Sequence, residues 1–235
     1  MAPLLSHAEW TALLLSVRVG LLSVVLEAPF ALGVAWLLAR RRFLGKTALD
    51  ALVHLPLVLP PVVTGYLLLI LLGRRGLIGG FLYDHFGLSV AFTWKAAVLA
   101  SAAMGFPLMV RAIRLAIELI DRRLEEAAQT LGAAPWQVFA RVVLPLAAPG
   151  VLTGFVLAFA RSLGEFGATL TFAGNIEGQS RTLPVAIYTF LQLPSGDAAA
   201  ERLVILSVVL SLGALAASEM LARAVKRRLG GGGRA

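Results

Sequence analysis

The chain has 235 residues, of which 59% are hydrophobic and 14% are charged, and its mean hydropathy is +0.86. Soluble domains typically carry about 45–50% apolar and about 25% charged residues, so this composition argues against a soluble globular protein and against a disordered one. The absence of cysteine excludes disulfides, thiolate metal sites and cysteine nucleophiles. A formal net charge of +8 suggests nucleic acid in a soluble protein, but in a membrane protein loop topology is the first explanation to test.

Five stretches are long and apolar enough to cross a bilayer, which requires about 20 largely apolar residues. We expect these spans at about residues 11–39, 48–73, 91–112, 146–172 and 203–222. The first basic residue is Arg18, so the cationic start of a secretory signal peptide is missing, and the first stretch is predicted to be a retained span. The predicted fold class is therefore an all-α membrane protein, a polytopic helical bundle.

Basic residues collect on one side of these spans. Of the 21 lysines and arginines, fourteen follow the first span, separate the third from the fourth, or follow the fifth. The positive-inside rule then places these segments and the C-terminus in the cytoplasm, and the N-terminus outside. Because topology accounts for the basic excess, we expect no nucleic-acid partner. Residues 224–235 are interpreted as a basic, glycine-rich cytoplasmic tail, flexible from Gly230 onward.

Motifs of enzymatic chemistry are missing from the sequence. Gly45-Lys46-Thr47 looks like the end of a phosphate-binding loop, but that motif needs a glycine where Arg40 stands. The metalloprotease, serine hydrolase and dinucleotide-binding motifs do not occur either. We therefore expect no ATPase site, no catalytic residue, no metal and no cofactor in this chain. A transporter or channel that works alone, without ATP, stays open at this point.

The polar connection between the third and fourth spans, about residues 121–145, carries the strongest signal. One short helix is expected to end at Gly132, and a second to begin at Pro135 and end near Leu144 and Pro145. Apolar and small side chains recur at helical spacing on both, at Leu124, Ala128 and Leu131 and at Trp136 and Phe139. Such a surface suits either docking to a partner or packing back on the bundle, and spacing does not separate the two.

This loop resembles the EAA signature of bacterial ABC importer permeases. Glu126-Ala127-Ala128 is followed after three residues by Gly132 and after nine more by 142–145, Val-Val-Leu-Pro, where the family usually begins with isoleucine. The resemblance implies coupling helices that seat in a groove of a separate ATP-binding subunit. It also implies that Glu126 caps or anchors the first coupling helix. The coupling residues expected on this basis are Glu126, Ala127, Ala128, Leu131, Gly132, Trp136, Phe139, Leu144 and Pro145.

Further segments, in the same order along the chain, resemble the molybdate permeases of this group. They are 55–66, 73–79, 105–114, 160–169 and 181–184. The resemblance implies one type I ABC importer transmembrane domain over residues 11–223, in a bacterial inner membrane, without the extra N-terminal span of some relatives. It further implies a second copy of this chain, two ATP-binding subunits that hold ATP and magnesium, and one external oxyanion-binding protein. Tungstate and sulfate, which are also tetrahedral dianions, are the alternative substrates.

Charges inside the fourth span need an explanation, because an unpaired charge is costly in a bilayer. Arg161 and Glu165 are four residues apart, so they are expected to share one helix face. Two interpretations stay open. Either Arg161 lines the oxyanion route and Glu165 limits its field, or the two form a packing pair near the gate. Arg18, near the outer end of its span, is expected to snorkel, and Glu27 has no assigned partner.

Prolines in the second span must kink or break it. A broken helix that lines a cavity and an ordinary kink are both compatible with the sequence. A short outer helix is expected near 184–192, either on the surface that meets the binding protein or facing lipid. The candidate pathway or gate residues are Pro60, Pro61, Thr64, Arg161, Gly164, Glu165, Phe166 and Gly167.

Overall fold

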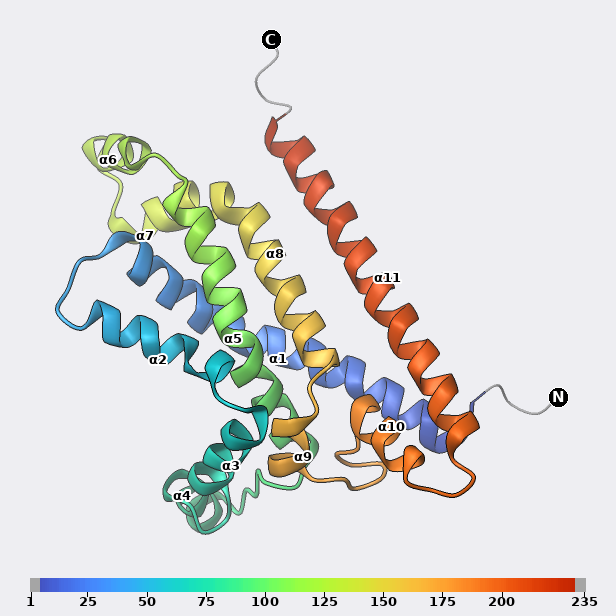
Figure 1. Ribbon diagram of the computed structural model, residues 1–235. Helices are drawn as coiled ribbons and strands as arrows, with labels where there is room; N and C mark the ends of the chain where they lie inside the picture. The colour runs from blue at the N-terminus through green and yellow to red at the C-terminus, as the bar shows by residue number, and fades with distance from the viewer. Residues whose placement is uncertain (1–4, 231–235) are drawn as a thin grey trace.

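The computed structural model describes residues 5–230, and within this range it contains helices and no strands (Figure 1). The helices in chain order are α1 (His7–Arg40), α2 (Lys46–Val58), α3 (Pro61–Leu72), α4 (Leu77–Phe86), α5 (Trp94–Glu118), α6 (Arg122–Thr130), α7 (Pro135–Val138), the π-helical turn η1 (Phe139–Val143), α8 (Leu144–Leu163), α9 (Gly167–Ala173), α10 (Leu183–Leu191) and α11 (Asp197–Gly230).

Four helical stretches of the described chain are long and apolar enough to cross a membrane, and the bent pair α2–α3 makes up to five. The four are α1, α5, the continuous stretch Pro135–Leu163 and the part of α11 from Asp197 to Ala217. These correspond to the predicted spans, although α5 runs six residues beyond the predicted end at 112 and α11 begins six residues before 203.

The second predicted span is broken between α2 and α3, which meet at an angle of 114°. A residue that precedes proline is driven out of the helical region, and both Leu59 and Pro60 are extended, with ψ of 143° and 135°. Pro61 then begins α3, where its missing N–H has no helical partner to lose. The second span is therefore broken and not merely kinked.

The fourth predicted span, 146–172, differs at both ends. Its helix already begins at Pro135, so the second short helix of the loop does not end near Leu144 and Pro145. The Leu144 N–H bonds to the carbonyl of Phe139, five residues back, and this wider turn carries the helix past Pro145, which has no N–H to donate. At the other end the helix stops at Leu163, and α9 starts afresh at Gly167.

Three smaller differences concern the termini and the outer segments. Helix α11 includes residues 224–230, so the first half of the predicted tail is helical, and 231–235 lie outside the described residues. Helix α4 was not predicted; it ends at Gly87, whose φ of +65° suits a left-handed cap. Helix α10 begins and ends within one residue of the range expected for the outer helix.

Helices α1, α5 and α8 form the centre of the bundle, and α1 crosses behind the other two (Figure 1). Gly150 and Gly154 stand one turn apart on α8, where it approaches α5. A Cβ at Gly150 would lie 2.2 Å from the Cβ of Ala116, and one at Gly154 would lie 3.2 Å from the Cγ of Met109. Small residues of this kind allow the close backbone approach on which helix packing in lipid depends.

Two polar residues of α1 have defined surroundings. The guanidinium of Arg18 lies over the ring of Trp94, 4.3 Å from its centroid, so the side chain stacks at the start of α5. Glu27 is 3% exposed and its carboxylate lies against Gly105 of α5. Its carboxylate oxygens have no hydrogen-bond partner in the described part of the chain.

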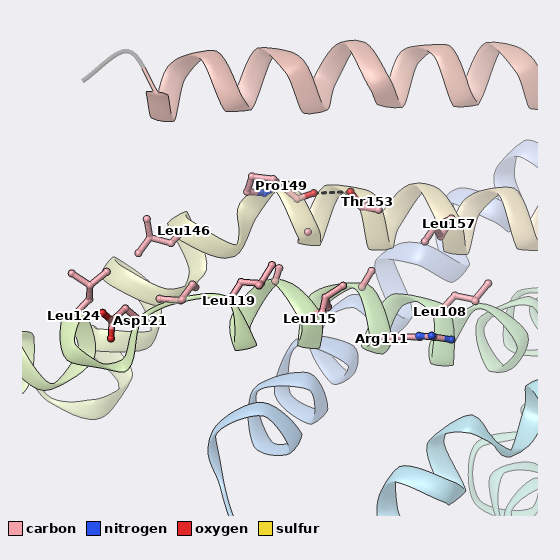
Figure 2. A pocket seen from close by; sticks show the side chains of 14 residues that line it. Leu108, Arg111, Leu115, Leu119, Asp121, Leu124, Leu146, Pro149, Thr153 and Leu157 are labelled. Atoms are coloured by element: carbon pink, nitrogen blue, oxygen red, sulfur yellow. Dashed lines mark hydrogen bonds between the residues drawn. The ribbon is translucent and has the colours of Figure 1, made fainter. Parts of the chain in front are cut away.

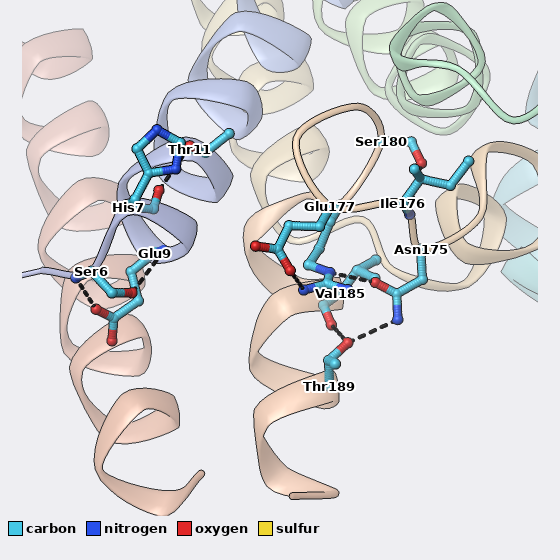
Figure 3. A network of polar contacts seen from close by, with 11 residues as sticks. Ser6, His7, Glu9, Thr11, Asn175, Ile176, Glu177, Ser180, Val185 and Thr189 are labelled. Atoms are coloured by element: carbon cyan, nitrogen blue, oxygen red, sulfur yellow. Dashed lines mark hydrogen bonds and ion pairs between the residues drawn. The ribbon is translucent and has the colours of Figure 1, made fainter.

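Polar contacts fasten the end of the bundle that lies opposite α6 (Figure 3). Ser6 and Glu9 bond each other's backbone N–H groups as a capping box, and Arg202 donates twice to Glu9 Oε1, at 3.0 and 2.7 Å. This links the beginnings of α1 and α11. Nearby, Asn175 donates to Thr189 Oγ1 at 2.9 Å and so holds the loop after α9 against α10.

Replacing Gly150 with alanine should lower the thermal stability of the protein, because α8 and α5 must move apart to admit the new methyl group. Overpacking of this kind typically costs about 1–3 kcal/mol. Gly33→Ala on α1 is the matched control, since its Cβ would meet no heavy atom within 4 Å. Thermal unfolding in detergent should show a loss for Gly150→Ala alone; equal unfolding temperatures would contradict the close contact.

Candidate functional site

The predicted coupling loop is formed by α6, a tight turn and α7, and it projects from one end of the bundle (Figure 1). At the turn Gly132 adopts φ +87°. Its N–H bonds to Gln129 O at 2.9 Å, and the N–H of Ala133 bonds to Ala128 O at 3.1 Å. These two bonds close the helix end as a Schellman motif, which requires the left-handed conformation that glycine adopts without strain. The predicted role of Gly132 in the turn agrees with this geometry.

The side chains of the loop divide into a projecting set and a set that packs inward. Leu131 is 89% exposed and Trp136 is 68% exposed, an unusual exposure for large apolar side chains. Phe139 instead turns toward α1 and meets Trp36 edge to face, with ring centroids 6.1 Å apart. Trp136 and Phe139 therefore do not share one docking face, because the helix continues into the bundle and carries Phe139 inward. Of the other predicted coupling residues, Glu126, Ala127 and Pro145 are exposed, and Ala128 and Leu144 are half-buried.

Within residues 5–230 Glu126 is not the cap of α6, and no hydrogen bond or ion pair joins it to the bundle. The N-cap of α6 is Asp121, whose carboxylate accepts the N–H of Arg123 at 3.0 Å. The contact with the bundle comes from Glu125, whose Oε1 lies 2.7 Å from Nη2 of Arg40 at the end of α1. Glu126 is exposed and borders a pocket of about 400 Å³ next to Arg40. Spacing along the chain did not distinguish two adjacent carboxylates, and only the position of α1 does so.

The candidate gate lies where the broken span meets the interrupted one. A Cβ at Gly167 would stand 2.9 Å from the Cβ of Pro61, and one at Gly65 would stand 2.7 Å from Ala168 O. The first turns of α3 and α9 are therefore in direct contact. Thr64 is buried within this contact and Pro60 is exposed outside it. A pocket of about 330 Å³ opens beside the contact, lined by Pro61, Val62, Arg161, Gly164, Glu165, Phe166 and Gly167.

Arg161 and Glu165 form an ion pair, with Nη1 and Oε2 2.7 Å apart. They do not share a continuous helix face as expected, because α8 ends at Leu163. Glu165 belongs to the short break, and its Oε1 accepts the N–H of Ala168 at 2.8 Å, at the start of α9. The Glu165 side chain is 1% exposed and that of Arg161 is 26% exposed. Glu165 thus holds the break to the start of α9, and Arg161 is the more exposed of the two at the pocket.

Sequence reasoning missed a groove of about 850 Å³ between α5 and α8 (Figure 2). Exposed leucines line it, among them Leu119, which is 80% exposed. Arg111 and Asp121 add charged groups to this otherwise apolar surface. Only the pairing of two helices that are distant in sequence creates the groove, so its sole sequence signal was a repeat of leucines along α5.

A neighbouring charge cluster was also missed. Arg114 donates to Asp50 of α2 at 3.0 Å and to Glu118 at 2.8 Å. The spacing of Arg114 and Glu118 could have indicated a helical ion pair, but the link to α2 could not be read from the chain. The cluster ties the first half of the broken span to α5.

Apolar helices around a closely packed centre, one broken span, one interrupted span and a projecting polar loop define a membrane permease subunit. The chain belongs to the family of binding-protein-dependent transport system inner membrane components, whose model matches residues 30–228. It is accordingly a multi-pass protein of the inner membrane.

Individual relatives are similar over most of their length. The molybdenum transport system permease protein ModB of Escherichia coli K12 is 57% identical over 227 residues, which cover 97% of this chain and 99% of the relative. The sulfate transport system permease protein CysT of the same organism is 39% identical over 189 residues, or 79% and 68% of the two chains. A bacterial alginate ABC transporter, solved with an alginate pentasaccharide-bound periplasmic protein, shares the fold with a TM-score of 0.72 at 21% identity, over 95% and 80% of the chains.

Replacing Gly167 with alanine should disturb the candidate gate, because the new Cβ would press on Pro61 at 2.9 Å. We expect a loss of stability of about 1–3 kcal/mol together with slower substrate uptake. Gly164→Ala is the matched control from the same pocket, since its Cβ would meet nothing within 4 Å. Unfolding and uptake measured on both variants should separate them, and an equal effect would argue against a contact-specific role.

Proposed function

We propose that this chain imports molybdate as the permease subunit of a binding-protein-dependent ABC importer. The observation that carries the proposal is the 57% identity to ModB of Escherichia coli over nearly the full length of both chains. The lower identity to the sulfate permease CysT makes sulfate the second candidate. Tungstate has no separate support beyond its shape and charge, which it shares with molybdate.

ATP hydrolysis is assigned to a partner subunit, because this chain lacks a phosphate-binding loop. ATP and its magnesium ion bind there, and this chain needs no cofactor of its own. The coupling loop, with Leu131 and Trp136 at its surface, seats in a groove of that partner. Two such partners act with two copies of the permease, and an external protein delivers the oxyanion.

The α5–α8 groove supports the pairing of two permease copies. Its exposed leucines form an apolar surface that a second copy would cover, and lipid is the other candidate occupant. The pathway then runs between the two copies, past α3, α8 and α9, with Arg161 at its edge. The outer helix α10 and its loop contribute to the surface that receives the binding protein.

Reconstitution tests this function directly. Proteoliposomes that contain this chain, its ATPase and its binding protein should take up labelled molybdate when ATP is supplied inside. An ATPase variant without its phosphate-loop lysine is the control and should abolish uptake. Uptake that persists in that control would restore the transporter that works alone. Uptake abolished by excess sulfate would keep the mechanism and change the substrate.

The role of Arg161 is tested by comparing a single with a double variant. Arg161→Ala leaves the Glu165 carboxylate buried without its partner, a change that typically costs about 3–5 kcal/mol, so uptake should fall. Arg161→Ala combined with Glu165→Gln removes both charges. Any loss of stability or assembly that Arg161→Ala causes should be reversed in this double variant. Uptake should stay low, because the positive charge at the pocket is still missing. Recovery of uptake in the double variant would instead establish a packing pair.

A further inference from the structure

Arg40, the last residue of α1, contacts the coupling loop at two points. Its Nη2 lies 2.7 Å from Oε1 of Glu125 on α6, and it donates to the carbonyl of Ile120 at 2.9 Å, just before α6 begins. The side chain of Arg40 is 8% exposed and that of Glu125 is 14% exposed. The guanidinium of Arg40 thus holds α6 both through the Glu125 carboxylate on the helix and through the backbone carbonyl of Ile120 just before it.

This arrangement differs from an ordinary surface ion pair. Exposed pairs between flexible side chains contribute little, because water and salt screen them. Here both partners are largely shielded from solvent, so water and salt screen their attraction less. The neighbouring Arg41 shares the pocket but lies over the ring of Trp36, 5.4 Å from its centroid. Arg40 is therefore the arginine of this pocket that connects α1 to α6.

Helix α1 continues from this connection to the neighbourhood of the gate. It is a single helix of 34 residues. At Gly20 a Cβ would lie 2.8 Å from Cε2 of Phe159 on α8, and the hydroxyl oxygens of Ser23 and Ser162 are 3.4 Å apart. The backbone carbonyl of Ser162 in turn accepts the N–H of Glu165, at 3.1 Å. An unbroken helix therefore touches the coupling loop at its end and α8 immediately before the gate.

We propose that Arg40 is a positioning residue that carries the movement of the coupling loop into α1. Helix α1 then acts as a second connection to the gate, in parallel with the continuous helix Pro135–Leu163. Two connections make the loop and the gate move as one body, whereas one helix alone could bend at its π-turn without moving the gate. This inference rests on the proposed function, because it requires an ATPase that moves the loop.

The test measures coupling in the full complex, reconstituted in proteoliposomes. Arg40→Gln and Glu125→Gln should leave the complex intact and ATP hydrolysis near its original rate. Molybdate uptake per ATP hydrolysed should fall at least about fivefold, the lower end of typical coupling between sites. The charge exchange, Arg40→Glu with Glu125→Arg, should restore a large part of this ratio. Arg41→Gln is the matched control and should leave it unchanged.

Several results would overturn the proposal. An unchanged ratio in both single variants would do so, as would a charge exchange that assembles without restoring it. Loss of the complex in both single variants would show a role in assembly and not in coupling. Failure of the proposed function is distinct, because the original chain would then show no uptake at all.

A second readout needs no substrate. The chain has no cysteine, so Arg42→Cys and Arg123→Cys would be its only labelled positions, and both are introduced in one of the two permease copies, with partner subunits that carry no reactive cysteine. In the original chain the distance between the two labels should stay constant when ATP binds to the complex. In the Glu125→Gln variant the same distance should change on ATP binding, because α6 is no longer held to α1. A distance that responds identically with and without Glu125→Gln would also overturn the proposal.

Discussion

Close packing of α5 against α8 supports the rest of this structure. In lipid no hydrophobic force drives helices together, so contact depends on how near their backbones can come. Gly150 and Gly154 supply that proximity, and α1 crosses the pair where Gly20 meets Phe159. The groove and the route from loop to gate lie along these three helices, and the candidate gate pocket lies at the end of α8. A change that separates them would alter every functional element together.

The two interruptions in the spans depend on one another. Backbone that leaves the helix at membrane depth must be buried in protein or face a water-filled cavity. The break after Leu163 meets this condition, because Glu165 is buried and the pocket lies beside it, and the break at Pro60 leads directly into Pro61, which contacts Gly167 and lines the same pocket. Glu165 satisfies one backbone N–H at the start of α9, that of Ala168, while it pairs with Arg161.

The coupling loop has both a free and a fastened side. Leu131 and Trp136 remain available to a partner, while Phe139 and Glu125 hold the loop to the end of α1. A docking element that was loose on the bundle would move without consequence for the gate. The proposed transmission of movement from the loop to the gate depends on this attachment, which comes from side chains that carry no signal in the sequence.

Local features of the sequence were sufficient for the class of fold, the long apolar helices and the turn at Gly132, and they predict the coupling loop. Span length, loop charge and glycine conformation act over a few residues and can be read along the chain. Tertiary structure alone decided that Arg40 takes Glu125 and not Glu126, that Phe139 turns inward, and that Gly167 rests on Pro61. It also created the groove between α5 and α8. The physical reason is that each of these contacts joins helices far apart in sequence, whose relative position follows from packing and from no local pattern.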